Sequence, residues 1–149
     1  MPLVSDLTMS VAYTFPMGIR IGGLYDHAKE DQRPIAGGPK KSIARDAWFV
    51  PITYDFGPHQ VGVGYGQANN LRGDSGVVGL AAGKDTGAAL ASVWYQYALS
   101  RRTSLYAFYS RFRNDRFAGY DFFSTAGSNA SFGAGADPQS IQLGIVHAF

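Results

Sequence analysis

The chain has 149 residues, of which 46% are hydrophobic, 14% aromatic and only 16% charged. Few charged, helix-favouring residues argue against a helical bundle or a coiled coil, and the aromatic content argues against disorder. The net charge of +2 is too small to indicate a nucleic-acid surface, and the lack of cysteine excludes disulfide scaffolds and thiolate metal sites. We expect no signal peptide and no transmembrane helix, because no apolar run approaches the ~20 residues that a helix needs to cross a bilayer. Hydropathy alone therefore indicates a soluble β-rich domain, although β-barrel membrane proteins escape such an analysis.

Large apolar residues alternate with small or polar ones along most of the chain, which is the pattern of β-strands. The first such stretch places Leu7, Met9 and Val11 on one face and Thr8 and Ser10 on the other. Seven strands are predicted in this way, giving an all-β antiparallel fold. They cover residues 7–15, 19–26, 48–56, 61–66, 91–99, 105–113 and 141–149.

The connections between the predicted strands alternate strictly between short and long. Short turns are predicted at residues 16–18, 57–58 and 100–103, and long polar or glycine-rich loops at about 27–46, 67–87 and 114–139. Outer-membrane β-barrels have this arrangement, with short periplasmic turns and long external loops. Strands of roughly 9–11 residues also match a tilted crossing of the bilayer.

Aromatic residues on the apolar face gather at the two ends of the predicted strands. A general preference of aromatic residues for strands would not sort them by depth and by face together. Two aromatic bands around an aliphatic belt are typical of a lipid-facing barrel wall. The predicted girdle comprises Tyr13, Phe15, Tyr25, Trp48, Tyr54, Phe56, Tyr65, Tyr97 and Phe112, with Phe149 at the short-turn end.

Two stretches of the sequence resemble Gram-negative general porins, especially those of the β-proteobacterial type. Residues 94–107 contain the pattern Tyr-x-Leu-Ser-Arg-Arg-Thr-x-Leu-Tyr, which in the family is the hairpin before the last external loop. Residues 144–149 resemble the family's ending, with alternating apolar residues, a histidine and a terminal phenylalanine. Such an ending is similar to the signal that the outer-membrane assembly machinery reads. The signal residues are Ile141, Leu143, Ile145, His147 and Phe149.

The resemblance implies an outer-membrane channel for passive diffusion of ions and small hydrophilic solutes. It implies a barrel of 16 strands, so that residues 1–149 form its carboxy-terminal part with no second domain. The implied partners are outer-membrane lipid, the barrel-assembly machinery and two further copies in a homotrimer of the full-length protein. We expect no enzymatic activity, no catalytic, cofactor or metal site, and no nucleic-acid partner.

The faces opposite the aromatic bands carry small polar residues with few charges, which suits a wet channel better than a soluble exterior. In the sixth predicted strand both faces hold aromatic residues, and its two arginines are taken to mark the polar face. By face and alternation, the candidate pore-lining residues are Arg20, Asp26, Thr53, Asp55, Gln96, Arg111 and Arg113.

Two other readings of the same pattern remain open. One is a small stand-alone outer-membrane barrel of eight strands with a structural or adhesive role, which would need one more strand than is predicted. The other is a soluble β-barrel that holds an apolar ligand inside.

Overall fold

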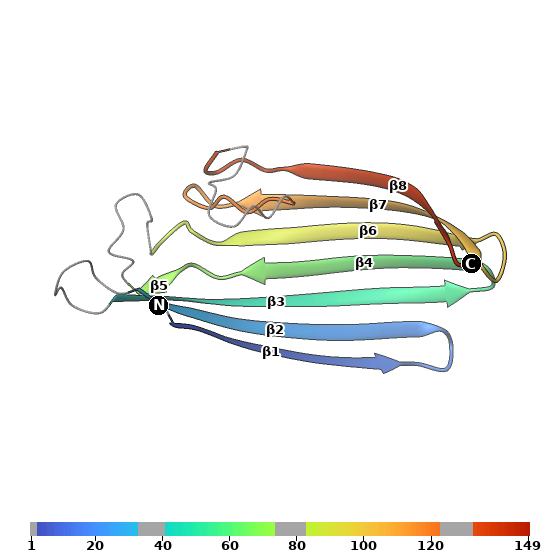
Figure 1. The fold of residues 1–149 in the computed structure, drawn as a ribbon, viewed down its shortest axis with the longest axis horizontal. Coiled ribbons are helices and arrows are strands. Elements are labelled where there is room, and N and C mark those ends of the chain that lie inside the picture. The colour runs from blue at the N-terminus through green and yellow to red at the C-terminus, as the bar shows by residue number, and fades with distance from the viewer. Residues whose placement is uncertain (1–2, 33–40, 74–82, 123–132) are drawn as a thin grey trace.

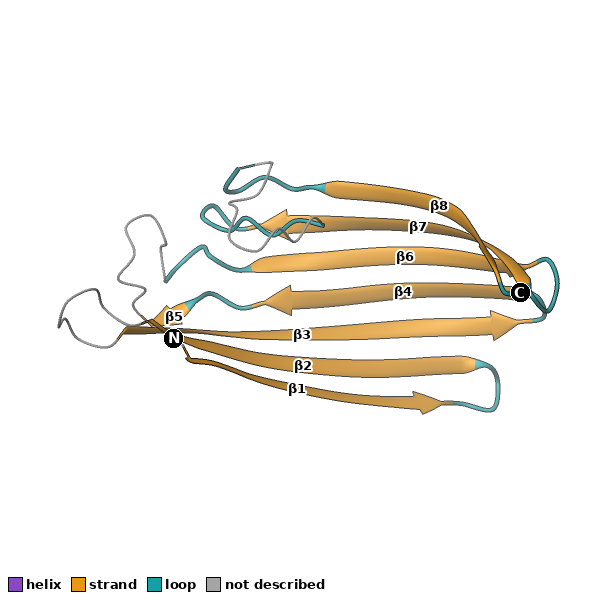
Figure 2. Cartoon of the chain, in the orientation of Figure 1, coloured by secondary structure: helices purple, strands orange, loops and turns teal. Residues whose placement is uncertain are grey.

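The computed structural model describes residues 3–32, 41–73, 83–122 and 133–149, which form one antiparallel sheet (Figure 1). All of its regular elements in these ranges are strands (Figure 2). No helix in the described part of the chain has the length and hydropathy needed to cross a membrane. The strands are β1 Leu3–Thr14, β2 Ile19–Gln32, β3 Lys41–Phe56, β4 His59–Ala68, β5 Arg72–Gly73, β6 Ala88–Ala98, β7 Thr103–Asn114 and β8 Gln139–His147.

Strands that are neighbours in the chain are also neighbours in the sheet, whose order is β1-β2-β3-β4-β6-β7-β8. The two-residue strand β5 lies off this path and pairs with β3 at Ile43 and Ala44. The antiparallel all-β fold predicted from alternation is therefore confirmed. Strand β5 was not predicted because two residues are too few to show alternation.

The second and third strands are longer than the sequence pattern predicts. The expected loop 27–46 is wrong at both ends, since β2 continues to Gln32 and β3 begins at Lys41. Backbone pairing from His27–Asp46 to Gln32–Lys41 holds this extension together. Its residues are mostly polar, so the hydrophobic period that marks a strand is lost although the backbone ladder continues.

The three short connections lie at one end of the sheet, and the strand ends between which the long connections run lie at the other (Figure 1). The first turn is closed by a hydrogen bond from Phe15 N to Ile19 O of 2.7 Å. Gly18 in this turn has φ of +87°, and a Cβ there would lie 2.5 Å from the carbonyl oxygen of Asp55. Only glycine fits this position without strain.

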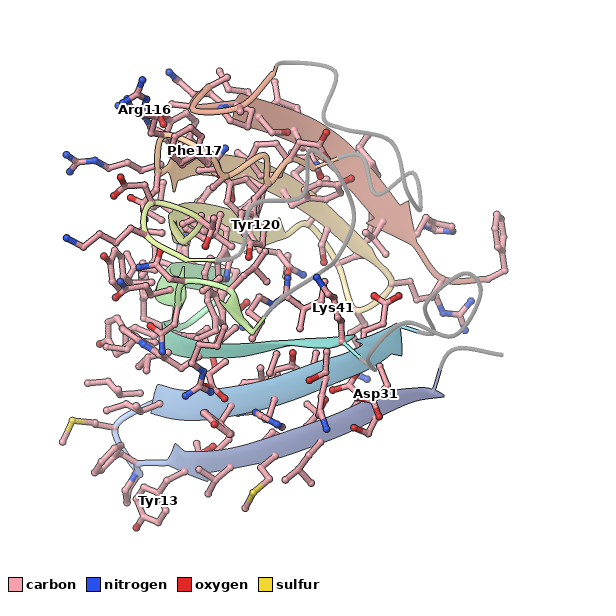
Figure 3. All side chains as sticks on the ribbon, turned by 90° about the vertical axis from the view of Figure 1, so that its left-hand side faces the viewer. Tyr13, Asp31, Lys41, Arg116, Phe117 and Tyr120 are labelled. Carbon is pink, nitrogen blue, oxygen red and sulfur yellow. The ribbon has the colours of Figure 1, made fainter. Side chains whose placement is uncertain are left out.

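The sheet is bent, with Tyr120 and Lys41 on its hollow side and Tyr13 on the outside (Figure 3). It does not close on itself, since β1 and β8 each have one neighbouring strand in the described part. Among the described residues only Ile43, Ala88 and Ala118 are buried hydrophobic residues, while many large apolar side chains are exposed. The sheet is thus a wall with two faces rather than the cover of a core.

Candidate pore wall

The strand register sorts the side chains onto two faces, because directly paired residues of antiparallel strands point to the same side. One row crosses all seven long strands on what we call the apolar face: Tyr13, Ile21, Ile52, Val63, Val93, Tyr109 and Ile141. The adjacent row lies on the other side, called the inner face: Thr14, Arg20, Thr53, Gly62, Trp94, Phe108 and Gln142.

The inner face is the hollow side of the bend. Arg45 lies on the inner face, because it is an even number of residues from Thr53 along β3 and pairs with Ala28, which is an even number of residues from Arg20 along β2. The Arg45 guanidinium lies 5.6 Å from the ring centroid of Tyr120, which occupies the hollow (Figure 3). A soluble β-barrel would turn its apolar face into the bend. Here the apolar face is on the outside and exposed, with Val63 at 52% and Ile141 at 75% of full exposure.

The aromatic residues of the apolar face form contiguous groups at its two ends. At the short-turn end Tyr54, Phe56, His59 and Tyr97 follow one another with ring centroids 5.0–5.2 Å apart. His59 was missing from the predicted girdle, although its place beside a turn between aromatic strands could have suggested it. The remaining predicted girdle residues except Phe112 lie on or beside this face, with Tyr13 packed edge-on against Phe15 and Trp48 near Tyr65 and paired with Tyr25. The prediction for Phe112 is wrong, because it lies on the opposite face.

Strand β7 corrects the prediction made from the sequence. Arg111 pairs with Ala91 and Arg113 with Ala89, so both arginines lie on the apolar face. Phe112 pairs with Leu90 and lies on the inner face. The face was chosen by charge, but these arginines stand at the long-loop end of the strand. A long guanidinium side chain there can reach beyond an apolar zone, so its charge does not identify the wet face.

The other predicted pore-lining residues share the inner face. Arg20 and Thr53 are paired neighbours, and Asp55 is followed across the sheet by Gln60 and Gln96. Gln60 Nε2 donates a 2.7 Å hydrogen bond to Asp55. Farther toward the long loops, Asp26 accepts a hydrogen bond of 2.8 Å from Thr8 and lies 3.9 Å from the Arg45 guanidinium. This face therefore presents charges of both signs and neutral hydrogen-bonding groups.

The segment after β7 folds back over the inner face. The Asn114 side chain donates to the carbonyl oxygens of Tyr120 and Ala136 and accepts from the Tyr120 N–H. Phe112 packs against Tyr120 and Phe122, with ring centroids 6.3 and 4.9 Å apart. Tyr120 also lies over Arg45 of β3, so this segment bridges part of the hollow. Sequence reasoning missed it because the predicted loop is dominated by glycine, serine and asparagine.

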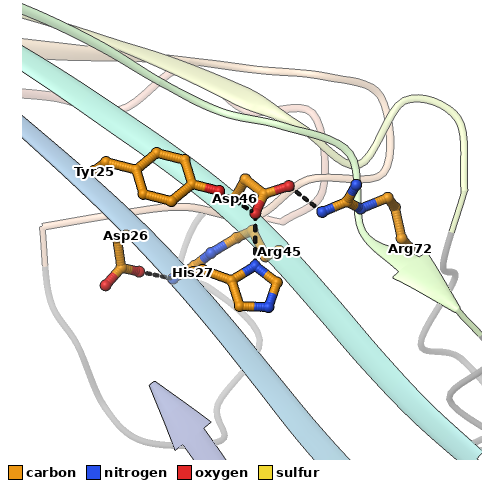
Figure 4. A network of polar contacts seen from close by, with 6 residues as sticks. All are labelled: Tyr25, Asp26, His27, Arg45, Asp46 and Arg72. Atoms are coloured by element: carbon orange, nitrogen blue, oxygen red, sulfur yellow. Dashed lines mark hydrogen bonds and ion pairs between the residues drawn. The ribbon is translucent and has the colours of Figure 1, made fainter. Parts of the chain in front are cut away.

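A polar cluster interrupts the apolar face at the long-loop end (Figure 4). Asp46 lies two positions along β3 from Trp48 and accepts hydrogen bonds from the Tyr25 hydroxyl at 2.8 Å and from His27 Nδ1 at 2.7 Å. Arg72 of β5 adds an ion pair to the same carboxylate. Three partners offset the cost of placing a charge on this face. The cluster also explains why the short strand β5 folds against the extended end of β3.

A bent antiparallel sheet with an aromatic-banded apolar exterior and a polar hollow side has the character of a transmembrane β-barrel wall. Residues 4–116 match the profile of the family described as Gram-negative porin, and the chain belongs to this family. It is accordingly a protein of the bacterial outer membrane, and its family consists of channels rather than enzymes.

The fold is similar to that of the anion-selective porin from Comamonas acidovorans, with a TM-score of 0.73 and 20% sequence identity. The match covers 97% of this chain and 39% of that porin, so the chain spans less than half of the length of the porin. A search of curated proteins found no match to the sequence.

Proposed function

We propose that this sheet is part of the wall of a water-filled channel through which ions and small hydrophilic solutes diffuse passively. The contrast between the two adjacent rows supports this proposal. Every residue of the apolar row is an aliphatic or tyrosine side chain, whereas the inner row holds Thr14, Arg20, Thr53 and Gln142. Lipid on one side and water on the other is the condition that stabilises both rows at once.

Within this channel, Arg20, Asp26, Thr53, Asp55 and Gln96 would contact the passing solute. The segment carrying Tyr120 and Phe122 would narrow the space beside them, because it bridges from β7 to Arg45 on β3. Arg111 and Arg113 are no longer candidates for the lumen. On the apolar face they would lie at the external lipid interface, together with the aromatic band of Tyr25, Trp48 and Tyr65.

We further propose that the sheet is the carboxy-terminal part of a barrel of 16 strands that assembles as a homotrimer. Open sheet edges are not tolerated in lipid, so further strands must cover β1 and β8. The proposed signal for the assembly machinery lies on one face of β8 and its extension, where Ile141, Leu143 and Ile145 are at least two-thirds exposed. His147 and Phe149 continue this surface and meet edge to face at 5.0 Å.

Reconstitution in planar lipid bilayers of the refolded protein, joined to the strands that complete its barrel, tests the channel proposal. Stepwise increases in current on insertion are expected, with a conductance that rises with salt concentration. Heat-modifiable migration in gels provides the control for a folded barrel. A folded, inserted protein without stepwise conductance would contradict the proposed channel and favour a structural or adhesive barrel.

A further inference from the structure

Aromatic rings on the inner face occupy the space beside glycines of neighbouring strands. A Cβ at Gly62 would overlap the indole of Trp94, and a Cβ at Gly64 would overlap the ring of Phe49. These glycines are buried, whereas Trp94 and Phe49 are only partly buried. One side of each ring therefore covers backbone, and the other side is available to the hollow of the sheet.

Trp94 and Phe49 form a wall shared by two adjoining hollows. One hollow of about 570 Å³ is apolar and continues from Trp94 to Phe108, whose ring centroid lies 6.4 Å from that of Trp94. The other hollow, of about 550 Å³, includes Arg20, Asp55 and Gln60. Both volumes lie in the range of roughly 300–1,000 Å³ that is typical of small-molecule sites.

We propose that these hollows form a subsite for a pyranose sugar, an inference that rests on the proposed channel and specifies one class of its solutes. A pyranose has a flat face of C–H groups, whose partial positive charge is attracted to the negative face of an aromatic ring. Its edge carries hydroxyl groups, each of which both donates and accepts hydrogen bonds.

The polar groups beside the rings favour a neutral polyhydroxylated solute over an ion. Arg20 only donates hydrogen bonds, the ionised Asp55 only accepts them, and Gln60 does both. Arg20 and Asp55 carry opposite charges, so their effects on a simple ion of either sign oppose one another in this hollow. Gln60 already donates to Asp55, and solute hydroxyl groups can bond with the donors and acceptors that these residues and Arg20 have left. The adjoining ring faces bind the apolar side of the same solute.

The sequence contains two tryptophans, which makes the inference directly measurable. Trp94 lies on the inner face, and Trp48 lies on the apolar face. A change of emission that is kept in a Trp48→Phe variant and lost in a Trp94→Phe variant comes from the proposed subsite. Both variants, joined to the strands that complete the barrel, are refolded in lauryldimethylamine oxide, a detergent without a sugar headgroup, and titrated with maltose.

We expect a saturable change in Trp94 emission with half-saturation on the order of 10 mM, as befits an open and weakly binding site. The acyclic polyol mannitol should give less than a tenth of this change, because it lacks a ring face. Trp48 emission should not respond to either compound. No saturable change at Trp94, or an equal response to mannitol or at Trp48, would overturn the inference.

Two further variants in the Trp48→Phe background separate the rings from the polar edge. Gly62→Ala should displace the indole and weaken maltose binding at least fivefold, and Asp55→Asn should weaken it severalfold without moving the indole. Arg111→Gln, on the apolar face, should have no effect, and circular dichroism monitors the strand content of each variant. Unchanged binding in both inner-face variants would contradict the subsite.

The outcome is independent of the channel test. Conductance without maltose binding would contradict the sugar subsite alone, whereas maltose binding without conductance would contradict the channel alone.

Discussion

The two faces of this sheet share one backbone, yet they differ in which substitutions they should tolerate. Across the apolar face, Ile21, Ile52, Val63 and Val93 form an exposed aliphatic row that needs no particular shape. The neighbouring residue of each strand points to the inner face. That face tolerates charge but is closely packed, because aromatic rings occupy the space beside its glycines. The apolar face is therefore restricted in polarity, and the inner face is restricted in volume.

The largest expected effect comes from placing a charge on the apolar face. Val63→Arg should lower the free energy of unfolding in lipid vesicles by about 2–4 kcal/mol, the cost of an arginine facing lipid near the bilayer midplane. Gln96→Arg on the inner face is the matched control and should change it by less than about 1 kcal/mol, because its charge stays in water. Urea titrations of both variants measure the difference. Equal losses would show that the two faces do not differ in solvent.

Added side-chain volume should destabilise the inner face more than the apolar face, which is the reverse of the effect of charge. Gly64→Val should destabilise the protein by about 1–3 kcal/mol, because its Cβ overlaps the Phe49 ring, which must move. Val63→Leu, one residue away on the apolar face, should cost less than about 0.5 kcal/mol, since lipid adapts to the added methylene. The same urea titrations apply. A neutral Gly64→Val would mean that the inner face is not closely fitted.

The smallest effect concerns the loop that follows β7. The backbone N–H of Asn114, followed by Arg111 and Arg113, holds the pKa of Asp137 below its ordinary value of 3.8. Because the pKa is lower in the folded protein, this contribution to stability is complete above the ordinary value and is lost as the pH falls through the lowered one. Asp137→Asn should therefore lower the thermal midpoint of unfolding at pH 6 to 7 but make progressively less difference below pH 3.8. A difference that persists unchanged in strong acid would contradict this origin.

Alternation predicted the strands and faces correctly wherever one face was clearly apolar, as in β1 and β4. It failed in β7, where Tyr106, Phe108 and Phe112 face Trp94 and its neighbours on the inner side, while Leu105 and Tyr109 face outward. Both faces of β7 are hydrophobic, so the two-residue alternation alone cannot show which face points to lipid and which points to the hollow. Only pairing with the unambiguous strand β6 decides the orientation.

The candidate site, like the fold, could be predicted only in part from the sequence. Arg20, Thr53 and Gln96 were placed on one face by spacing within single strands, which needs no tertiary information. The seating of Trp94 on Gly62 and the contact of Tyr120 with Arg45 depend on cross-strand register and on a loop that folds back. Sequence spacing carries no signal for either contact, because the partners lie 32 and 75 residues apart.

Ion selectivity tests most directly whether the inner face borders the channel. In planar bilayers with a potassium chloride gradient, Arg20→Glu should shift the reversal potential toward cation preference, because it replaces a positive charge beside the passing ions. Arg111→Glu makes the same change of charge on the apolar face and should leave the reversal potential nearly unchanged. A shift with Arg111→Glu and none with Arg20→Glu would contradict the assignment of the two faces.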